Sequence, residues 1–335
     1  MRPSLYPRLV NGPFDDPGLY ITFIFEKDSI LFDLGEINSL SSREILKISH
    51  VFVTHTHMDH FSGFDRVLRL FLGRNKMLSL YGPEGFIHNI TGKLAGYSWN
   101  LVDRYDNTFS LNITEILPDR HRCCRFSCRS RFMPEAPVVE VPFKTVLVES
   151  PGWIISSVIL DHAIPCLAFS IQEKFHVNIK KDRLKALGLN AGPWIMDFKQ
   201  AMFAGADPSS IFQVIDAKHP DRRISFELGW LSREIATITS GQKITYITDV
   251  IFSLDNIEKM VALARGSDHL FIEAAFMEAH RQIAEDKYHL TAWQAGTLAA
   301  MAGVRQFTTF HYSPRYIGQE NLLTEEAIRA YTLKP

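Results

Sequence analysis

The residues best suited to chemistry lie together in the segment THTHMDH, residues 54–60. His55 and His57 are two positions apart and therefore point to one side of an extended chain. Asp59 and His60 follow at a turn into a helix and can face a second centre. Imidazole nitrogens and carboxylate oxygens are ligands for zinc, and also for manganese or iron. This spacing favours a metal site over unrelated polar residues at the end of a strand.

Further ligands for a site with two metals must come from other strand ends. His162, Asp249 and His311 each follow or end a hydrophobic run that predicts a strand. Singly, each is more often an ordinary core or surface residue, but the set in this order predicts ligands. Two metals about 3.5–4 Å apart can share a hydroxide and clamp a phosphate. The expected arrangement has one metal on His55, His57 and His162, the other on Asp59, His60 and His311, and Asp249 bridging the two.

The elements that must position these side chains are short strands and helices, arranged in two halves. Runs rich in β-branched and aromatic residues predict strands over residues 20–27, 29–35, 50–55, 242–249, 269–276 and 305–311. Apolar residues at helical spacing predict helices among them. Strands and helices in each half predict an α+β fold, with two sheets sandwiched between helices.

Residues 173–223 depart from this pattern. They carry several lysines and arginines, then the turn-rich LGLNAGPW, then a polar segment with GADPSS. We expect this stretch to be an inserted basic arm, a possible RNA exosite, within a single domain of residues 1–335.

Composition narrows the class of protein. The 335 residues carry 36 basic and 37 acidic side chains, which excludes a uniformly basic nucleic-acid coat but leaves room for a local patch. Four cysteines, three of them crowded at residues 123–128, do not resemble a secreted disulfide framework. The amino terminus lacks the apolar run of a signal peptide, and no stretch is long and apolar enough for a membrane span. We therefore expect a soluble cytoplasmic protein.

The order of these motifs resembles a known family. HTHMDH, followed by a lone histidine, a lone aspartate and a late histidine, is similar to the pattern of metallo-β-lactamase-fold hydrolases. Within that superfamily the chain resembles the ribonuclease Z family, endonucleases that mature tRNA 3′ ends. The motifs that carry this resemblance are LFDLGE, LYGPEG, DHAIPCLAF, FIEAAF, HLTAWQAGTLAAMAG and FHYSPRY, and it covers most of residues 20–318. It implies a four-layer αββα sandwich that holds two zinc ions per chain, with manganese or iron as alternatives.

The same motifs separate this chain from other members of the superfamily. Asp249 stands where many β-lactam-hydrolysing members have cysteine, and His57 stands where di-iron oxygen reductases have glutamate. Glyoxalase-type thioesterases share the seven ligands but lack Glu273, His289 and HYSPRY. These differences disfavour all three activities.

The resemblance also implies catalytic roles. Asp59, a ligand beside the attacking hydroxide, is the candidate general base. His289 would protonate the leaving 3′-oxygen, and Glu273 would orient it. The alternatives are a surface carboxylate that closes a strand for Glu273 and a helix cap for His289. Arg315 can hold a phosphate bidentately, or form an ordinary ion pair.

Two basic segments can meet RNA. Residues 120–131, RHRCCRFSCRSR, interleave arginines with Phe126, which suits phosphate contact and base stacking. The alternative is a solvated hairpin, and the cysteine spacing matches no zinc finger. Residues 175–194 resemble the arm with which ribonuclease Z grips the tRNA elbow, and Gly192 and Pro193 match its turn. The alternative there is a basic, solvated helix with a turn.

The chain departs from the family pattern at the mouth of the site. RLVNGPFDDPG stands where the family has a GTG-type turn, and INSLSSRE follows LFDLGE. The favoured hypothesis is a metal-dependent phosphodiesterase, a divergent ribonuclease Z-like endonuclease that removes the 3′ trailer of pre-tRNA. One alternative is an enzyme of the same fold acting on small cyclic or linear phosphodiesters. The other is a non-catalytic RNA-binding protein that keeps the metals for folding. The resemblance further suggests a homodimer in which one subunit's arm serves the other's active site.

Overall fold

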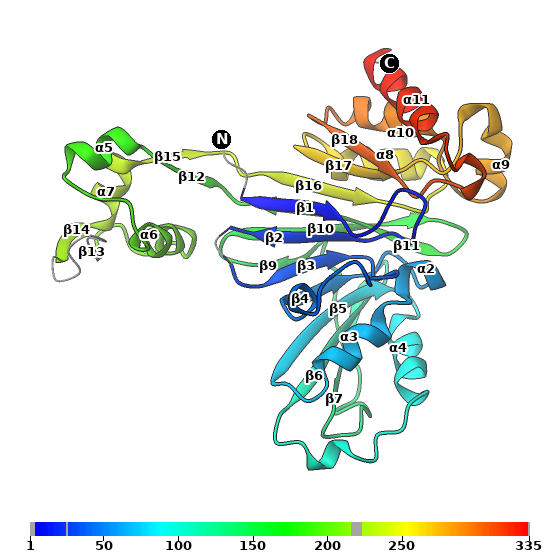
Figure 1. Cartoon of the computed structure of the whole chain (residues 1–335), viewed down its shortest axis with the longest axis horizontal. Coiled ribbons are helices and arrows are strands. Elements are labelled where there is room, and N and C mark those ends of the chain that lie inside the picture. The colour runs from blue at the N-terminus through cyan, green and yellow to red at the C-terminus, as the bar shows by residue number, and fades with distance from the viewer. Residues whose placement is uncertain (1–3, 25, 216–222, 334–335) are drawn as a thin grey trace. The chain divides into compact units, whose positions relative to one another are not determined.

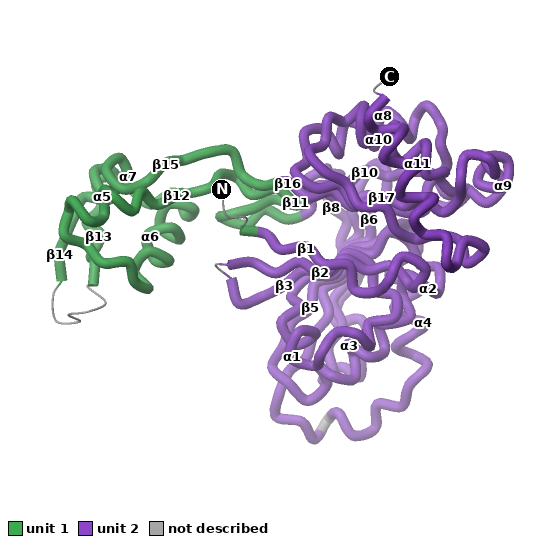
Figure 2. Tube along the Cα trace, turned by 45° about the horizontal axis from the view of Figure 1, so that its top comes forward, with its two compact units in different colours: residues 1–4, 148–155, 171–242 green, residues 5–147, 156–170, 243–335 purple. Residues whose placement is uncertain are grey.

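The computed structural model describes residues 4–24, 26–215 and 223–333. The chain divides into two compact units, shown in different colours in Figure 2. The larger unit is formed by residues 5–147, 156–170 and 243–335, and the smaller unit by residues 1–4, 148–155 and 171–242.

The first sheet has eight strands in sequence order, β1-β2-β3-β4-β5-β6-β7-β8. They are β1 (Leu5–Leu9), β2 (Leu19–Phe23), β3 (Ser29–Phe32), β4 (Ile48–Phe52), β5 (Lys76–Pro83), β6 (Phe109–Ile116), β7 (Arg120–Ser127) and β8 (Val139–Pro142). Strands β3 to β6 run parallel, and the outer pairs are antiparallel. Helices α1 (Ser42–Ile45), α3 (Phe64–Phe71) and α4 (Phe86–Ala95) pack their apolar faces against this sheet.

The second sheet has six strands in the order β18-β17-β16-β11-β10-β9. They are β9 (Val146–Glu149), β10 (Trp153–Asp161), β11 (Pro165–Glu173), β16 (Lys243–Ile247), β17 (His269–Glu273) and β18 (Phe307–Phe310). Strands β16, β17 and β18 run parallel. Helices α8 (Leu254–Ala264), α9 (Arg281–Asp286), α10 (Ala292–Met301) and α11 (Glu320–Leu333) contribute to the apolar cluster on this side.

Aromatic side chains fill the space between the two sheets. Phe32 of β3 stacks on Phe169 of β11 and on Tyr246 of β16, with ring centroids 5.5 and 5.9 Å apart. Such rings bury large apolar areas and so hold the two sheets together. Figure 1 shows helices α3 and α4 on one side of the paired sheets and α8 and α10 on the other. The expected sandwich of two sheets between helices is confirmed.

The smaller unit has its own apolar cluster. It pairs β12 (His176–Ile179) with β15 (Ala236–Thr239), and β13 (Ile211–Ile215) with β14 (Arg223–Glu227). Helices α5 (Lys181–Ala186), α6 (Trp194–Phe203) and α7 (Leu228–Ile235) enclose buried residues such as Trp194 and Phe198. The unit includes the segment expected to be an arm, of which residues 216–222 lie outside the described residues. The sequence had not predicted these four strands, because lysines and turn residues interrupt their periodicity.

Candidate metal centre

The candidate metal centre lies where parallel strands end. Asp33 follows β3, Asp249 comes two residues after β16, Glu273 ends β17, and His311 follows β18. The carboxyl ends of parallel strands are the usual ligand-binding edge of such sheets. The fold thereby brings together side chains that are up to 278 residues apart, since 311 − 33 = 278.

Sharp backbone turns aim several of these side chains. Asp33, Asp249 and His311 have φ values of 58°, 50° and 59°. This left-handed region is uncommon for residues other than glycine, although Asp and His tolerate it better than most. Ala163 and Tyr288, which adjoin His162 and His289, have φ values of 58° and 59°. Such strained residues concentrate at functional sites, where the surrounding structure holds them in place.

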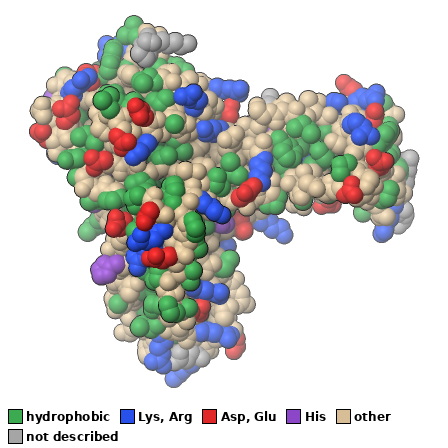
Figure 3. All heavy atoms as spheres, turned by 180° about the vertical axis from the view of Figure 1, so that it is seen from behind, with side chains coloured by type: hydrophobic (Ala, Val, Ile, Leu, Met, Phe, Trp, Pro, Cys, Tyr) green, Lys and Arg blue, Asp and Glu red, His purple; other side chains and the backbone are tan. Residues whose placement is uncertain are grey.

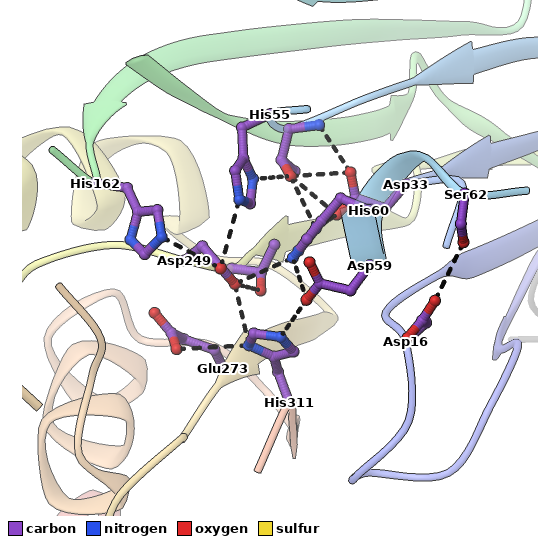
Figure 4. A network of polar contacts seen from close by, with 12 residues as sticks. Asp16, Asp33, His55, Asp59, His60, Ser62, His162, Asp249, Glu273 and His311 are labelled. Atoms are coloured by element: carbon purple, nitrogen blue, oxygen red, sulfur yellow. Dashed lines mark hydrogen bonds and ion pairs between the residues drawn. The ribbon is translucent and has the colours of Figure 1, made fainter. Parts of the chain in front are cut away.

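The first half of the centre consists of His55, His57, His162 and Asp249, whose candidate ligand atoms all lie within 4.8 Å of one another. Nε2 of His55 and Nε2 of His162 lie 3.6 and 3.4 Å from Oδ2 of Asp249. The rings of His55 and His57 meet edge to face, with centroids 4.3 Å apart. The predicted first set of ligands is thus assembled in one place. Figure 4 shows three of its members, His55, His162 and Asp249.

The second half consists of Asp59, His60 and His311, which lie equally close together. Oδ2 of Asp59 is 3.4 Å from Nε2 of His60 and 3.4 Å from Nε2 of His311. Asp249 faces this half with its other oxygen. Its Oδ1 lies 3.5 Å from Nε2 of His60 and 3.0 Å from Nδ1 of His311. One carboxylate therefore presents one oxygen to each half.

A buried carboxylate that sequence reasoning had not assigned supports the second half. Asp33, fully buried, accepts hydrogen bonds from Nδ1 of His60 at 2.9 Å and from the Tyr246 hydroxyl at 3.0 Å. It also accepts from the backbone N–H of Thr54 at 2.7 Å. The available signal was its place in LFDLGE, directly after a strand. Tyr246 could not be recognised from the sequence, because a tyrosine inside a strand is usually an ordinary core residue.

Neutral groups support the first half. Nδ1 of His162 lies 2.7 Å from the carbonyl oxygen of Tyr288, to which it can donate. Nδ1 of His55 lies 3.1 Å from the Thr54 hydroxyl and 3.9 Å from Sγ of buried Cys166. In both histidines this leaves Nε2 to face Asp249, since a hydrogen bond at one ring nitrogen selects the tautomer.

Glu273 and His289 form a pair beside both halves. Nδ1 of His289 lies 2.8 Å from Oε2 of Glu273, whose Oε1 accepts the backbone N–H of Val250 at 2.8 Å. The His289 ring lies 5.1 Å from that of His162 and 5.5 Å from that of His311. Burial lowers the pKa of His289, but the Glu273 carboxylate outweighs it and the pKa is raised above its ordinary value. His289 therefore lies beside both ligand clusters, and its raised pKa favours the protonated imidazole.

The electrostatics of the centre suit bound cations. Burial opposes a charge on Asp249, yet His311 and His60 hold its pKa well below the usual range. Burial lowers the pKa of His55 to about 2, which keeps this imidazole neutral as a ligand must be. Nε2 of His55 and Nε2 of His60 are buried without a hydrogen-bond partner among the described residues. Buried polar atoms are rarely left so, and one metal ion on each of these nitrogens would satisfy both.

The predicted substrate contacts lie in two places. Arg315 is exposed in the larger unit, with its guanidinium 5.5 Å from the centre of the Phe276 ring. No carboxylate of the described residues forms an ion pair with it, so a free cation is the better description of Arg315 than a structural ion pair. Gly192 and Pro193 belong to the smaller unit, where they precede α6 and accept its first backbone N–H groups from Ile195 and Met196.

The arginine-rich segment 120–131 begins as strand β7 of the first sheet. Its arginines are largely engaged by neighbouring carboxylates: Arg120 with Asp119, Arg122 with Glu115, and Arg125 with Glu135, at 2.7, 2.8 and 3.0 Å. The cysteines carry no disulfide, and Cys124 and Cys128 are buried. These contacts favour the structural interpretation of the segment over RNA contact.

Comparison with solved structures identifies the class of fold. The metallo-β-lactamase fold protein YhfI from Bacillus subtilis superposes over 98% of this chain and 93% of its own, with a TM-score of 0.55 at 14% identity. The short form of human tRNase Z covers 93% of each chain, with a TM-score of 0.52 at 16% identity. The chain has the metallo-β-lactamase fold.

Curated sequences give the particular relatives. Ribonuclease Z of Deinococcus radiodurans is 28% identical over 92% of this chain and 90% of its own length. Ribonuclease Z of Bacillus subtilis is 27% identical over 90% of this chain and 83% of its own. The chain is thus homologous to ribonuclease Z, and the resemblance noted in its motifs is confirmed. No protein-family model matches the chain. None of the helices in the described ranges is long and apolar enough to cross a membrane.

Proposed function

We propose that the chain is a metal-dependent endoribonuclease that removes the 3′ trailer of pre-tRNA. The proposal rests on the position of Asp249, a single carboxylate that faces both ligand clusters. The chain is also similar to ribonuclease Z over 92% of its length. A carboxylate that faces both clusters suits a phosphodiester-cleaving centre, in which two metals lie about 3.5–4 Å apart.

The residues suited to hold the metals are the two clusters described above. His55, His57 and His162 would hold one ion, Asp59, His60 and His311 the other, and Asp249 would contact both. Zinc is the ion that this donor set suits best, with manganese or iron as alternatives. Bound there, the ions would lower the pKa of water towards about 7 and neutralise the oxygens of the phosphate.

Asp59 is the general base in this mechanism. Its side chain keeps 42% of its surface exposed, whereas Asp249 keeps 3%, so a water molecule and a substrate can reach it. Its Oδ2 is directed at His60 and His311. The carboxylate can therefore stay anchored while it takes a proton from the attacking water.

His289 supplies the proton for the departing 3′-oxygen. Because its Nδ1 is engaged by Glu273, its Nε2 is the atom that would carry this proton. Glu273 is fully buried and held by the backbone of Val250, so it fixes the ring and favours its charged form. Arg315, which has no carboxylate partner among the described residues, would bind a further phosphate of the RNA.

The smaller unit is proposed as the inserted arm that contacts RNA. Its helix α5 exposes Lys181, Arg183 and Lys185 while Leu184 is buried. Arg183 pairs with Glu234, so the two lysines are the stronger candidates for phosphate contact. Elsewhere the two signs of charge are mixed: on the face shown in Figure 3, lysine and arginine side chains lie among aspartates and glutamates.

Two further expectations accompany the proposal. The first is a homodimer in which one subunit's arm serves the other's site. Size-exclusion chromatography with light scattering tests it, and a mass equal to that of a monomer would reject it. A cytoplasmic location stays a prediction.

The direct test is cleavage of a 3′-extended pre-tRNA by the wild type and by Asp59→Ala, with zinc or manganese added. The expected result is a single cut at the acceptor end that leaves a 3′-hydroxyl, absent in the variant. Asp65→Ala, which removes a half-exposed carboxylate six residues away that pairs with Lys93, is the matched control and should cleave as the wild type does.

Two outcomes would redirect the proposal. Intact RNA with rapid turnover of bis(p-nitrophenyl) phosphate would reject the tRNA substrate and favour a small phosphodiester. Intact RNA and no turnover, despite two bound metals, would reject the enzyme and leave a metal-containing RNA-binding protein.

A further inference from the structure

The loop between β1 and β2 is tied together by its own hydrogen bonds. The backbone N–H of Val10 donates to Gly18 at 2.8 Å and closes the loop at its base. Nδ2 of Asn11 donates to the carbonyl of Asp16 at 2.8 Å, and the backbone N–H of Gly12 donates to Oδ2 of Asp15 at 3.1 Å. The loop is therefore a preformed unit. Its sequence, NGPFDDP, stands where the ribonuclease Z family has a glycine-rich turn.

One side chain of this loop bonds to two segments that carry the second half of the metal centre. Oδ2 of Asp16 accepts the Ser62 hydroxyl at 3.2 Å, a contact drawn in Figure 4, and the backbone N–H of Glu36 at 2.9 Å. Ser62 is the C-cap of the short helix α2 (Met58–Phe61), which contains Asp59 and His60. Glu36 lies three residues after Asp33, the carboxylate that holds His60.

The other end of the loop bonds beside the third ligand. The carbonyl of Pro13 accepts the backbone N–H of Tyr312 at 2.7 Å. The Phe14 ring packs edge to face on Tyr312, with centroids 5.5 Å apart. Tyr312 directly follows His311, where the chain turns through a left-handed φ. Anchors of the loop thus adjoin Asp59–His60 and His311.

Close packing couples the loop to these ligands. A Cβ on Gly35 would lie 2.2 Å from the carbonyl oxygen of Asp59 and 2.6 Å from Cβ of Asp16. Gly35 thus lies where the ligand segment and the loop pack so closely that no side chain fits between them. Among the described residues, the hydrogen bonds of the loop reach residues near the second half of the metal centre. None of them reaches a residue next to His55 or His162.

We propose that the β1–β2 loop is the positioning element of the second metal subsite, with Asp16 as its positioning residue. It fixes the distance between α2 and the end of β18, and so the distance between Asp59–His60 and His311. The first subsite, whose ligands the loop does not anchor, would fill independently of it. The inference rests on the proposed two-metal centre.

The experiment measures zinc stoichiometry and the two stepwise dissociation constants, by competition with a chelating dye, for the wild type and for Asp16→Ala. The expected result is that one step loses about 10-fold in affinity, the low end for partners that bond directly to metal ligands, while the other step is unchanged. Asp16→Asn should restore wild-type binding, because an amide oxygen can accept both hydrogen bonds. Asp15→Ala is the matched control: it removes the adjacent charge, whose only described bond lies within the loop, and should bind as the wild type does.

Ser62→Ala keeps the inference testable if Asp16→Ala fails to fold, because it deletes one hydroxyl and one bond to Asp16. It should weaken the same step in the same direction, by less. Unchanged binding in both variants, or an equal loss at both steps, would overturn the inference. A wild type that binds fewer than two metals would instead reject the proposed centre, so the two failures are distinguishable.

Discussion

The two halves of the metal centre use similar ligands but different supports. In the first half, His55 and His162 meet a hydroxyl, a thiol and a backbone carbonyl, all of them neutral. In the second half, His60 meets the buried carboxylate of Asp33, which the Tyr246 hydroxyl also contacts. A carboxylate partner makes an imidazole a more basic ligand than a neutral partner does. In the second half the partner of His60 is therefore charged, whereas the partners of His55 and His162 in the first half are neutral.

The difference follows from where the ligands stand in the fold. His55 and His162 follow β4 and β10, strands that the two sheets hold in place. His60 lies in a four-residue helix, α2, which makes few hydrogen bonds of its own. A short helix needs external anchors to hold a side chain in place. Asp33 and the β1–β2 loop supply them.

The largest expected effect comes from the residue common to both halves. Asp249→Ala should abolish binding of both metals and lower cleavage by more than about 10³-fold, since even outer partners of metal ligands contribute about 10- to 100-fold. Metal content by mass spectrometry and the rate of pre-tRNA cleavage check this. Asp255→Ala, an exposed carboxylate six residues on, is the control. Retention of one tightly bound metal would show that the halves do not share Asp249.

His289→Ala should separate catalysis from both halves. His289 adjoins each cluster, and its imidazole is hydrogen-bonded to Glu273, so its loss should lower kcat by about 10²- to 10⁴-fold, the usual contribution of a general acid. Two metals should remain bound. His269→Ala, at the opposite end of β17 from Glu273, is the matched control and should leave kcat unchanged. A fall in metal content equal to the fall in rate would instead make His289 a ligand.

The ligands of the metal centre can be predicted from the sequence more readily than the groups that support them. The ligands were predictable because histidine and aspartate at strand ends are unusual, and the structure brings all seven together. The paired sheets were predictable from apolar periodicity. The supports were not, because Tyr246 and Cys166 are ordinary core residues in sequence and acquire a role only where two sheets meet. Strand β7 was missed because its arginines, paired with carboxylates across the sheet, hide the alternation.

Asp33→Asn should weaken the second half more than the first, which Asp33 reaches through the Thr54 hydroxyl beside His55. Asparagine tolerates the left-handed φ at this position, so the backbone should persist. The amide can donate to Nδ1 of His60, which would move the proton of the imidazole to Nε2, the atom that faces Asp249. We expect one metal step to lose about 10- to 100-fold in affinity and the other to change by less. Zinc competition titration checks this. An equal loss at both steps would contradict the division of the centre into separately supported halves.

Cys166→Ala is expected to have the smallest effect and probes the first half alone. Sγ of Cys166 lies 3.9 Å from Nδ1 of His55, too far for a strong bond, and 3.4 Å from the carbonyl of Thr248. Its loss should cost about 1 kcal/mol of stability, an ordinary value for a core substitution, while the affinity of the metal step that Asp33→Asn affects less changes by less than 10-fold, the low end for outer partners. Cys128→Ala, equally buried in the first sheet's apolar cluster, should cost similar stability and leave metal affinity unchanged. If Cys166→Ala weakened metal binding as strongly as Asp33→Asn, the thiol would hold His55 as firmly as a carboxylate holds His60, and the two halves would be supported alike.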